Sequence, residues 1–213
     1  RKRFENVQGV LGSLTLDQDE DVSTYGIYLR NKVDVSNNWG LGLGVRYDSN
    51  QFDVSDNLLS DEDQSGTQTL SSWSGSAGTT WKIRKDFNLF VNFSTAFETP
   101  AIIELANNHS GVGGLNPDLD PRYSFSYETG IKGNLETLLS YEFSVFLIRT
   151  RDEIVPFEVS QFPGRSFFKN SGNSERSGME IAFSYRVKPT LNFQLAYTYS
   201  NFKLREFSEN SVD

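Results

Sequence analysis

Apolar and polar residues alternate along much of this chain with a period of two. In "LGLGVRY", Leu41, Leu43 and Val45 fall on one parity, and glycines and Arg46 fall on the other. Because successive side chains of a strand point to opposite faces, this pattern predicts a strand with one apolar face and one small or polar face. No helical pattern of useful length is present. We predict about eight strands, near residues 23–35, 39–52, 67–83, 87–95, 123–133, 138–149, 178–187 and 191–200.

The predicted connections are short at one end of the strands and long at the other. Short turns fall near 36–39, 84–86, 134–137 and 188–190. Long polar connections fall at 54–66, 97–122 and 150–175, and an acidic one falls at 17–21. This asymmetry is typical of outer-membrane β-barrels, whose periplasmic turns are short and whose extracellular loops are long.

Aromatic residues lie where the two membrane interfaces of such a barrel would be. Trp39 and Trp81 fall near the short turns, whereas Tyr47 and Tyr123 fall toward the long loops. Strands of about ten residues are long enough to span a bilayer at a tilt. The predicted fold class is therefore all-β, an antiparallel up-and-down transmembrane β-barrel.

Composition narrows the function classes. Hydrophobic residues make up 37% and aromatic residues 14%, which suits a structure with one apolar and one wet face. The net charge of −8 argues against nucleic-acid binding, which needs a basic surface. With one histidine, no cysteine and no G-x-S-x-G sequence, we find no catalytic arrangement, predict that the protein is not an enzyme, and expect no cofactor.

Alternation alone leaves a second fold open. A soluble extracellular β-sandwich that binds carbohydrate through its loops would also hide one face of each strand. Strand length, loop asymmetry and the many Gly, Ser, Asn and Ala residues on the second face favour the membrane barrel over this alternative.

Several segments resemble the TonB-dependent outer-membrane receptors. "AFETPAIIEL" resembles the family's "AF-x-x-P-x-x-x-E-L" segment, "NPDLDP" its "NP-x-L-x-P" loop, "YETGIK" its "YE-x-G-x-K" strand, and "NSGNSERSGME" its "N-x-G-x-x-x-x-x-G-x-E" strand entry. The matching residues are Ala96, Phe97, Pro100, Glu104, Leu105, Asn116, Pro117, Leu119, Pro121, Tyr127, Glu128, Gly130, Lys132, Asn170, Gly172, Gly178 and Glu180. They occur in the family's order and on the predicted strands.

The resemblance implies energised uptake of a scarce nutrient, often a ferric siderophore, across the outer membrane of a Gram-negative bacterium. The implied partners are outer-membrane lipid, a small-molecule ligand, and TonB acting through a plug domain. In the family the barrel has twenty-two strands, so we expect residues 1–213 to be one partial barrel domain, a section of about eight strands without the plug or the barrel's C-terminus. A passive porin-like channel is a further alternative.

The loop at 97–122 is the candidate ligand-binding segment. The candidates for ligand contact on this loop are His109, Asn107, Asn108, Asp118 and Asp120. A single histidine does not make a metal site, so none is predicted. On the polar strand faces, the charged residues Arg46, Glu128, Lys132, Glu180 and Arg186 are expected to pair across strands or to contact a plug.

Overall fold

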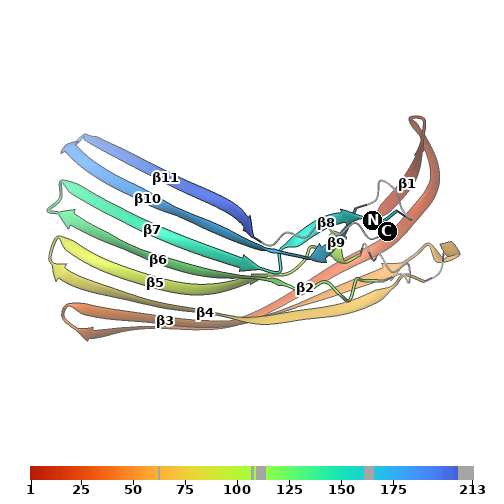
Figure 1. The fold of residues 1–213 in the computed structure, drawn as a ribbon, viewed down its shortest axis with the longest axis horizontal. Coiled ribbons are helices and arrows are strands. Elements are labelled where there is room, and N and C mark those ends of the chain that lie inside the picture. Colours follow the sequence, from red (N-terminus) through yellow and green to blue (C-terminus); the bar gives the residue numbers. More distant parts are fainter. Residues whose placement is uncertain (62, 107, 109–113, 161–165, 206–213) are drawn as a thin grey trace.

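The computed structural model describes residues 1–61, 63–106, 108, 114–160 and 166–205, and within them nine antiparallel strands form one curved sheet (Figure 1). The sheet order is β1-β2-β3-β4-β5-β6-β7-β10-β11. Its strands are β1 (Lys2–Val7), β2 (Val10–Ser36), β3 (Trp39–Asp56), β4 (Gly66–Arg84), β5 (Phe87–Glu98), β6 (Arg122–Leu135), β7 (Leu139–Arg151), β10 (Asn173–Lys188) and β11 (Leu191–Arg205). The all-β, antiparallel, up-and-down prediction is confirmed, and the described sheet is not closed.

The eight predicted strands correspond to β2–β7, β10 and β11. The prediction missed β1, which holds only two apolar residues, Phe4 and Val7, and gives little alternation. It also missed the hairpin of β8 (Ile154–Glu158) and β9 (Ser166–Asn170). This hairpin lies outside the large sheet, in which β7 pairs directly with β10. In the described part of the connections lie a 3-10 turn (Leu59–Asp61) and a short helix, α1 (Ile102–Leu105). No helix in the described part of the chain is long and apolar enough to cross a membrane.

Apart from the two-residue turn 8–9, which lies at the end of β2 opposite the turn 37–38, the connections follow the predicted asymmetry. Residues 37–38, 85–86, 136–138 and 189–190 form short turns at one end of the sheet, and residues 57–65, 99–121 and 152–172 form long connections at the other. The prediction of an acidic connection at 17–21 was wrong, because these residues belong to β2, where Asp21 lies opposite Asp53 of β3. Asp53 accepts hydrogen bonds from Thr67 and Gln51, which stabilise its charge on the strand.

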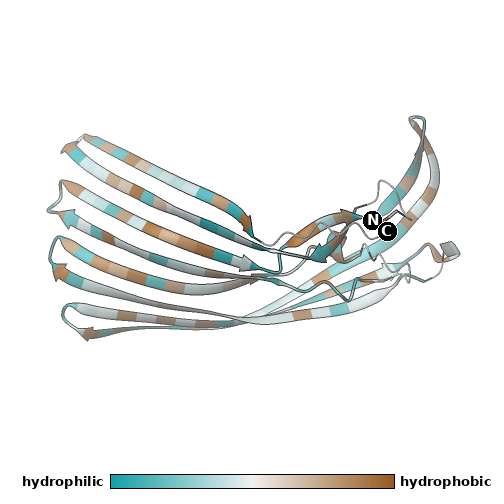
Figure 2. Cartoon of the chain, in the orientation of Figure 1, coloured by the Kyte–Doolittle hydropathy of each residue, from teal (hydrophilic) through white to brown (hydrophobic). Residues whose placement is uncertain are grey.

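The polarity of the two sheet faces inverts along β3. Near the short turns, the odd face carries Leu43 and Val45, both exposed, as expected for a surface that meets lipid. Farther along β3, the same face carries Gln51 and Asp53, and the opposite face, which near the turns holds glycines and Arg46, carries Phe52 and Val54, both buried. The lipid-facing part of β3 therefore ends between these two regions. Figure 2 shows the hydropathy of each residue along the strands.

Two aromatic pairs mark the limits of the apolar band. Trp39 lies opposite Trp81 near the short turns, and Tyr47 lies opposite Trp73 toward the long loops, with ring centroids 5.0 Å apart. The stretch from Trp39 to Tyr47 fits the roughly nine to eleven residues that a tilted strand needs to span a bilayer. The predicted placement of Trp39, Trp81 and Tyr47 as interfacial residues agrees with this geometry.

Candidate ligand-binding site

The described residues of the connection 99–121 fold onto the inner face of the sheet, which is the face that carries Phe52 and Val54. They lie on the long-loop side of the apolar band. Pro100 is buried and precedes helix α1, where the backbone N–H of Ala101 donates to the carboxylate of Glu104 at 2.7 Å. This contact satisfies one of the donors that a helix N-terminus leaves unpaired. Because α1 has only one turn, packing rather than helix propensity must hold it in place.

Three leucines of this connection make a core with the sheet. Leu105, Leu115 and Leu119 are buried against the side chains of Phe52, Val54 and Leu70. Ile102, Ala106, Ile154 and Phe168 pack around the cluster. Complete burial of a leucine contributes about 1.5–3 kcal/mol relative to exposure, so the connection is anchored over the lumen by its own apolar side chains.

Two asparagines tie the long connections together. The side chain of Asn116 is only 1% exposed; its amide donates to the carbonyl of Phe168 at 3.4 Å, and its carbonyl oxygen accepts from the N–H of Asp118 at 3.1 Å. The side chain of Asn170 bonds both backbone groups of Asp120 and also donates to the carbonyl of Asp152 at 2.8 Å. Both asparagines belong to the segments that resemble the receptor family, and here their role is to join connection 99–121 to connection 152–172.

Arg122 joins the same two connections through charge. Its guanidinium donates to Glu98, which lies opposite on β5, at 3.1 Å and to Glu153 at 2.9 Å. Glu153 also accepts from the hydroxyl of Ser174. Hydrogen bonding to Glu98, opposed by partial burial and aided by Glu153, raises the pKa of Arg122 above its ordinary value. Arg122 is therefore charged at any physiological pH.

A polar cavity of about 480 Å³ lies between α1 and the inner face of the sheet. Its polar lining residues are Thr24, Asn50, Glu98, Thr99, Glu104 and Arg122. The hydroxyl of Thr24 donates to the side-chain oxygen of Asn50 at 2.7 Å. The cavity thus presents two carboxylates, hydroxyls, an amide and one guanidinium that is already paired, a set suited to hydrogen bonding with a hydrophilic molecule.

Of the predicted site residues that the structure describes, Asn108, Asp118 and Asp120 are not among the lining residues of this cavity. His109 and Asn107 lie outside the described residues. Asn108 is half-buried and has a bonding partner, whereas Asp118 and Asp120 expose their side chains to solvent on the same connection. The sequence interpretation overlooked the lining residues Glu98 and Arg122, although both lie within the candidate loop 97–122, and it assigned Glu104 to a family motif without a role.

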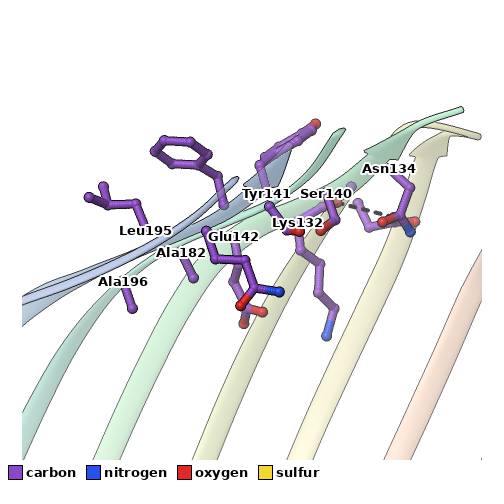
Figure 3. Close-up of a pocket in the computed structure, with 13 residues that line it drawn as sticks. Lys132, Asn134, Ser140, Tyr141, Glu142, Ala182, Leu195 and Ala196 are labelled. Atoms are coloured by element: carbon purple, nitrogen blue, oxygen red, sulfur yellow. Dashed lines mark hydrogen bonds between the residues drawn. The ribbon is translucent and has the colours of Figure 1, made fainter. Parts of the chain in front are cut away.

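A second, larger hollow of about 700 Å³ lies near the short turns, across β5, β6, β7, β10 and β11. Figure 3 shows Glu142, Lys132 and Ala182 on one side of the sheet and Tyr141 and Leu195 on the other. Lys132 lies opposite Glu142, and its ammonium lies 4.9 Å from the centroid of the Phe90 ring.

The partners of two of the predicted charged residues can be followed on the inner face. Glu128 accepts a cross-strand hydrogen bond from Asn92 at 3.2 Å. Arg46 instead pairs along its own strand, with Nε 2.6 Å from the carboxylate of Asp48. The cross-strand pairing predicted for Arg46 was therefore wrong. Asp48 lies two residues along β3 on the same face, so its carboxylate is within reach of the guanidinium on the same strand.

Comparison with known proteins agrees with the geometry. An open antiparallel sheet with short turns at one end, loops at the other and an apolar outer band defines a section of a membrane β-barrel. Residues 2–213 match the model of the TonB dependent receptor-like β-barrel family, and the chain belongs to that family.

The chain is similar to longer receptors over most of its own length. It is 22% identical over 194 residues to the "Probable TonB-dependent siderophore receptor PiuA" of Acinetobacter baumannii, covering 88% of this chain and 25% of that protein. It is 23% identical over 184 residues to the "Metal-pseudopaline receptor CntO" of Pseudomonas aeruginosa, covering 84% and 24%. The structure of the alcaligin receptor FauA from Bordetella pertussis superposes with a TM-score of 0.66 at 21% identity, covering 88% and 31%. The chain thus spans about a quarter of the curated relatives it matches.

Proposed function

We propose that this chain forms part of the barrel wall of a receptor in the outer membrane of a Gram-negative bacterium, and that the receptor takes up a metal–chelator complex such as a ferric siderophore. Support comes from the family and from the names of two relatives, one a siderophore receptor and the other a receptor for a metal complex. Family members are receptors and transporters, which agrees with the lack of a catalytic arrangement in the sequence.

The observation that carries the proposal is the anchoring of connection 99–121 over the lumen. A loop that held only water-exposed side chains would leave the barrel mouth open. Here Leu105, Leu115 and Leu119 fix the connection to the inner face, and the polar cavity lies directly beneath α1. We place the ligand contacts of this section at the cavity residues Glu98 and Glu104, with Asn108, Asp118 and Asp120, as well as His109 and Asn107, as further contacts on the same connection.

Energy for uptake would come from TonB through a plug domain, a partner that we assign outside residues 1–213. In this proposal the present section supplies wall and loops, and movement of the plug opens the path. The inner-face residues near the short turns, including Lys132 and Glu142, then face the space that a plug would occupy.

The two alternatives make different predictions. A β-sandwich requires a second sheet packed face to face with the first, whereas the other sheet in the described residues is only the β8–β9 hairpin. A passive porin-like channel would conduct without an energy source, so uptake by it would persist when the proton gradient is dissipated.

The test is uptake by the full-length receptor in its own cells. Disruption of its gene should abolish uptake of at least one metal–chelator complex from a labelled panel, and a protonophore should abolish the same uptake. The Glu104→Gln variant keeps a side-chain acceptor for α1 but removes a cavity charge, and it should weaken ligand binding several-fold. Glu136→Gln, in a short turn at the opposite end, is the matched control. Uptake of the whole panel that survives both gene disruption and protonophore would exclude the proposal.

A further inference from the structure

Four basic side chains share the outward face of β7 and β11 just beyond the apolar band. They are Arg149, Arg151, Lys203 and Arg205, all of them exposed, and we call them the basic patch. Their parity is that of Val145 on β7 and Tyr199 on β11, which are 42% and 53% exposed and face lipid. Because the parity is unbroken from one region to the other, the patch faces away from the lumen and continues the lipid-facing surface.

The strand register shows how sharply polarity changes there. Moving away from the short turns, the outward rows across β7, β10 and β11 are Val145–Met179–Tyr199, then Leu147–Ser177–Asn201, then Arg149–Glu175–Lys203, then Arg151–Asn173–Arg205. One row separates an apolar surface from a charged one. The charged rows are thus at the height where lipid headgroups begin.

Aromatic residues border the patch on its β6 side. The guanidinium of Arg151 lies 5.3 Å from the centroid of the Phe125 ring, and Tyr123 lies opposite Arg151 on β6. Tyr127, one row below Phe125, contacts Phe93 with ring centroids 5.1 Å apart. Aromatic rings at this level are typical of the membrane interface.

The patch carries excess positive charge in a chain whose net charge is −8. Among the described residues, the carboxylate that forms ion pairs with the patch is Glu175, which bridges Arg149 at 3.3 Å and Arg205 at 3.2 Å. The two arginine side chains are nevertheless 60% and 56% exposed, so each keeps free donors. One carboxylate cannot neutralise four cations, and surface ion pairs of this kind contribute little to stability by themselves.

We propose that the basic patch binds the phosphate groups of the glycolipid in the outer leaflet, that is, the lipid A part of lipopolysaccharide. Arginine matches phosphate through two parallel N–H donors, and lysine adds a point charge. An outward basic cluster beside an aromatic border, one row above the lipid-facing band, places these donors at the headgroups. The inference rests on the proposed location in the outer membrane.

Strands near the other edge of the sheet supply a built-in control at the same long-loop end. Beyond the polarity inversion of β3, the outward face of β2 and β3 carries Asp19, Asp21 and Asp53 instead of bases. Without divalent cations this acidic surface should repel the same phosphates. Substitutions there alter charge on the same outward face but leave the basic patch intact.

The experiment uses the full-length receptor extracted from the outer membrane in mild detergent with a chelator present. Co-purified lipopolysaccharide is quantified by mass spectrometry of its hydroxylated fatty acids. In the variant with Arg149→Gln, Arg151→Gln, Lys203→Gln and Arg205→Gln, the amount of co-purified lipopolysaccharide should fall about tenfold or more below that of the wild type. The variant with Asp19→Asn, Asp21→Asn and Asp53→Asn should retain as much as the wild type or more. Heat-modifiable migration on gels shows that each variant is folded.

A second variant is expected to bind more lipid instead of less, a result that misfolding could not produce. Glu175→Gln frees Arg149 and Arg205 from their internal partner, so it should increase bound lipid, whereas a purely structural ion cluster would give no increase. Added lipid A should raise the melting temperature of the wild type, and neither dephosphorylated lipid A nor inorganic phosphate should do so. Equal effects of dephosphorylated lipid A or of free phosphate overturn the proposal.

Different results would contradict the proposed outer-membrane location and the proposed lipid site. If the receptor is missing from the outer-membrane fraction, both the proposed location and this inference are wrong. If it is present there and the fourfold variant retains normal lipid, the basic patch does not bind lipopolysaccharide and the transport proposal is unaffected.

Discussion

Asn170 and Asp120 exchange two hydrogen bonds: the N–H of Asp120 donates to Oδ1 of Asn170 at 2.7 Å, and Nδ2 of Asn170 donates to the carbonyl of Asp120 at 2.9 Å. A side-chain amide thus pairs with backbone as a neighbouring strand would. The pairing joins two connections that are far apart in the sequence.

Replacing Asn170 with alanine should loosen connection 99–121 without unfolding the barrel. Unpaired backbone groups cost about 1–3 kcal/mol when buried, and somewhat less where water reaches them. We expect faster amide hydrogen exchange at residues 114–121 in the full-length receptor. Asn201→Ala, at an exposed position on β11, should leave exchange in this connection unchanged. Equal exchange rates at residues 114–121 in the two variants would show that the hydrogen bonds between Asn170 and Asp120 do not stabilise the connection.

Replacing Arg122 should weaken the same region. In Arg122→Gln, Glu98 and Glu153 lose the cation that lies between them. The variant should therefore have a lower melting temperature than the wild type, because two carboxylates are left side by side without their shared partner. Arg122→Lys keeps the charge but not the planar donors, and it should fall between the wild type and the glutamine variant.

Glu175 and Asp63 should make the long-loop end less stable in acid. Hydrogen bonding to Arg205 lowers the pKa of Glu175, and hydrogen bonding to Ser65 lowers the pKa of Asp63. A carboxyl group whose pKa is lower in the folded state stabilises that state above its unfolded pKa, and the contribution is lost as the pH falls through the folded value. The protection factors of amides near these residues, which are corrected for the pH dependence of intrinsic exchange, should fall below about pH 4, and Glu175→Gln should flatten this dependence around β10 and β11. Unchanged dependence in the variant would contradict the assignment.

Gly130 should not tolerate alanine. A Cβ atom there would lie closer than 3.0 Å to the carbonyl oxygen of Phe143 and to the Phe90 ring. Gly130→Ala should cost about 1–3 kcal/mol through overpacking, seen as a lower denaturant midpoint for barrel unfolding. Gly42→Ala, where the nearest atom would be 3.9 Å away, is the control and should have a much smaller effect. Similar midpoints for the two variants would indicate that β6 shifts easily.

Adjacent residues of β5 should report the two faces of the sheet. Val91 is 46% exposed on the lipid-facing parity, whereas Asn92 lies on the inner face beside Glu128. An arginine on the lipid face near the bilayer midplane costs about 2–4 kcal/mol. Val91→Arg should reduce folding into lipid vesicles strongly, and Asn92→Arg, next to a carboxylate, should be tolerated. The reverse order would place the lumen on the wrong face.

The strands could be predicted because alternation is a local signal. The spacing of Leu41, Leu43 and Val45 indicates a shared face without information from the rest of the chain, and the short polar segments between strands indicate hairpin turns. The pattern does not reveal β1, because Phe4 and Val7 are its only apolar residues, and it favours a loop at 17–21, because acidic residues are rare in strands that face a core.

The site was harder to predict because its contacts are not local. Nothing in the spacing of Leu105, Leu115 and Leu119 reveals that they bury Phe52 and Val54. The recognised motif pointed to the correct connection, yet it gave no reason for Asn116 and Asn170, whose hydrogen bonds depend on how two connections meet. Arg122 and Glu98 could be assigned as partners only after the register of β5 and β6 was known.

The inversion of polarity along β3 makes this part of the chain unusually intolerant of changes in length. A one-residue deletion between Trp39 and Tyr47 would turn every side chain that follows it to the other face. Arg46 would then point into lipid, and Phe52 and Val54 would point into water and leave the three leucines of the loop without a partner. Membrane insertion and loop anchoring would fail together, so the number of residues in the span is constrained as tightly as their identity.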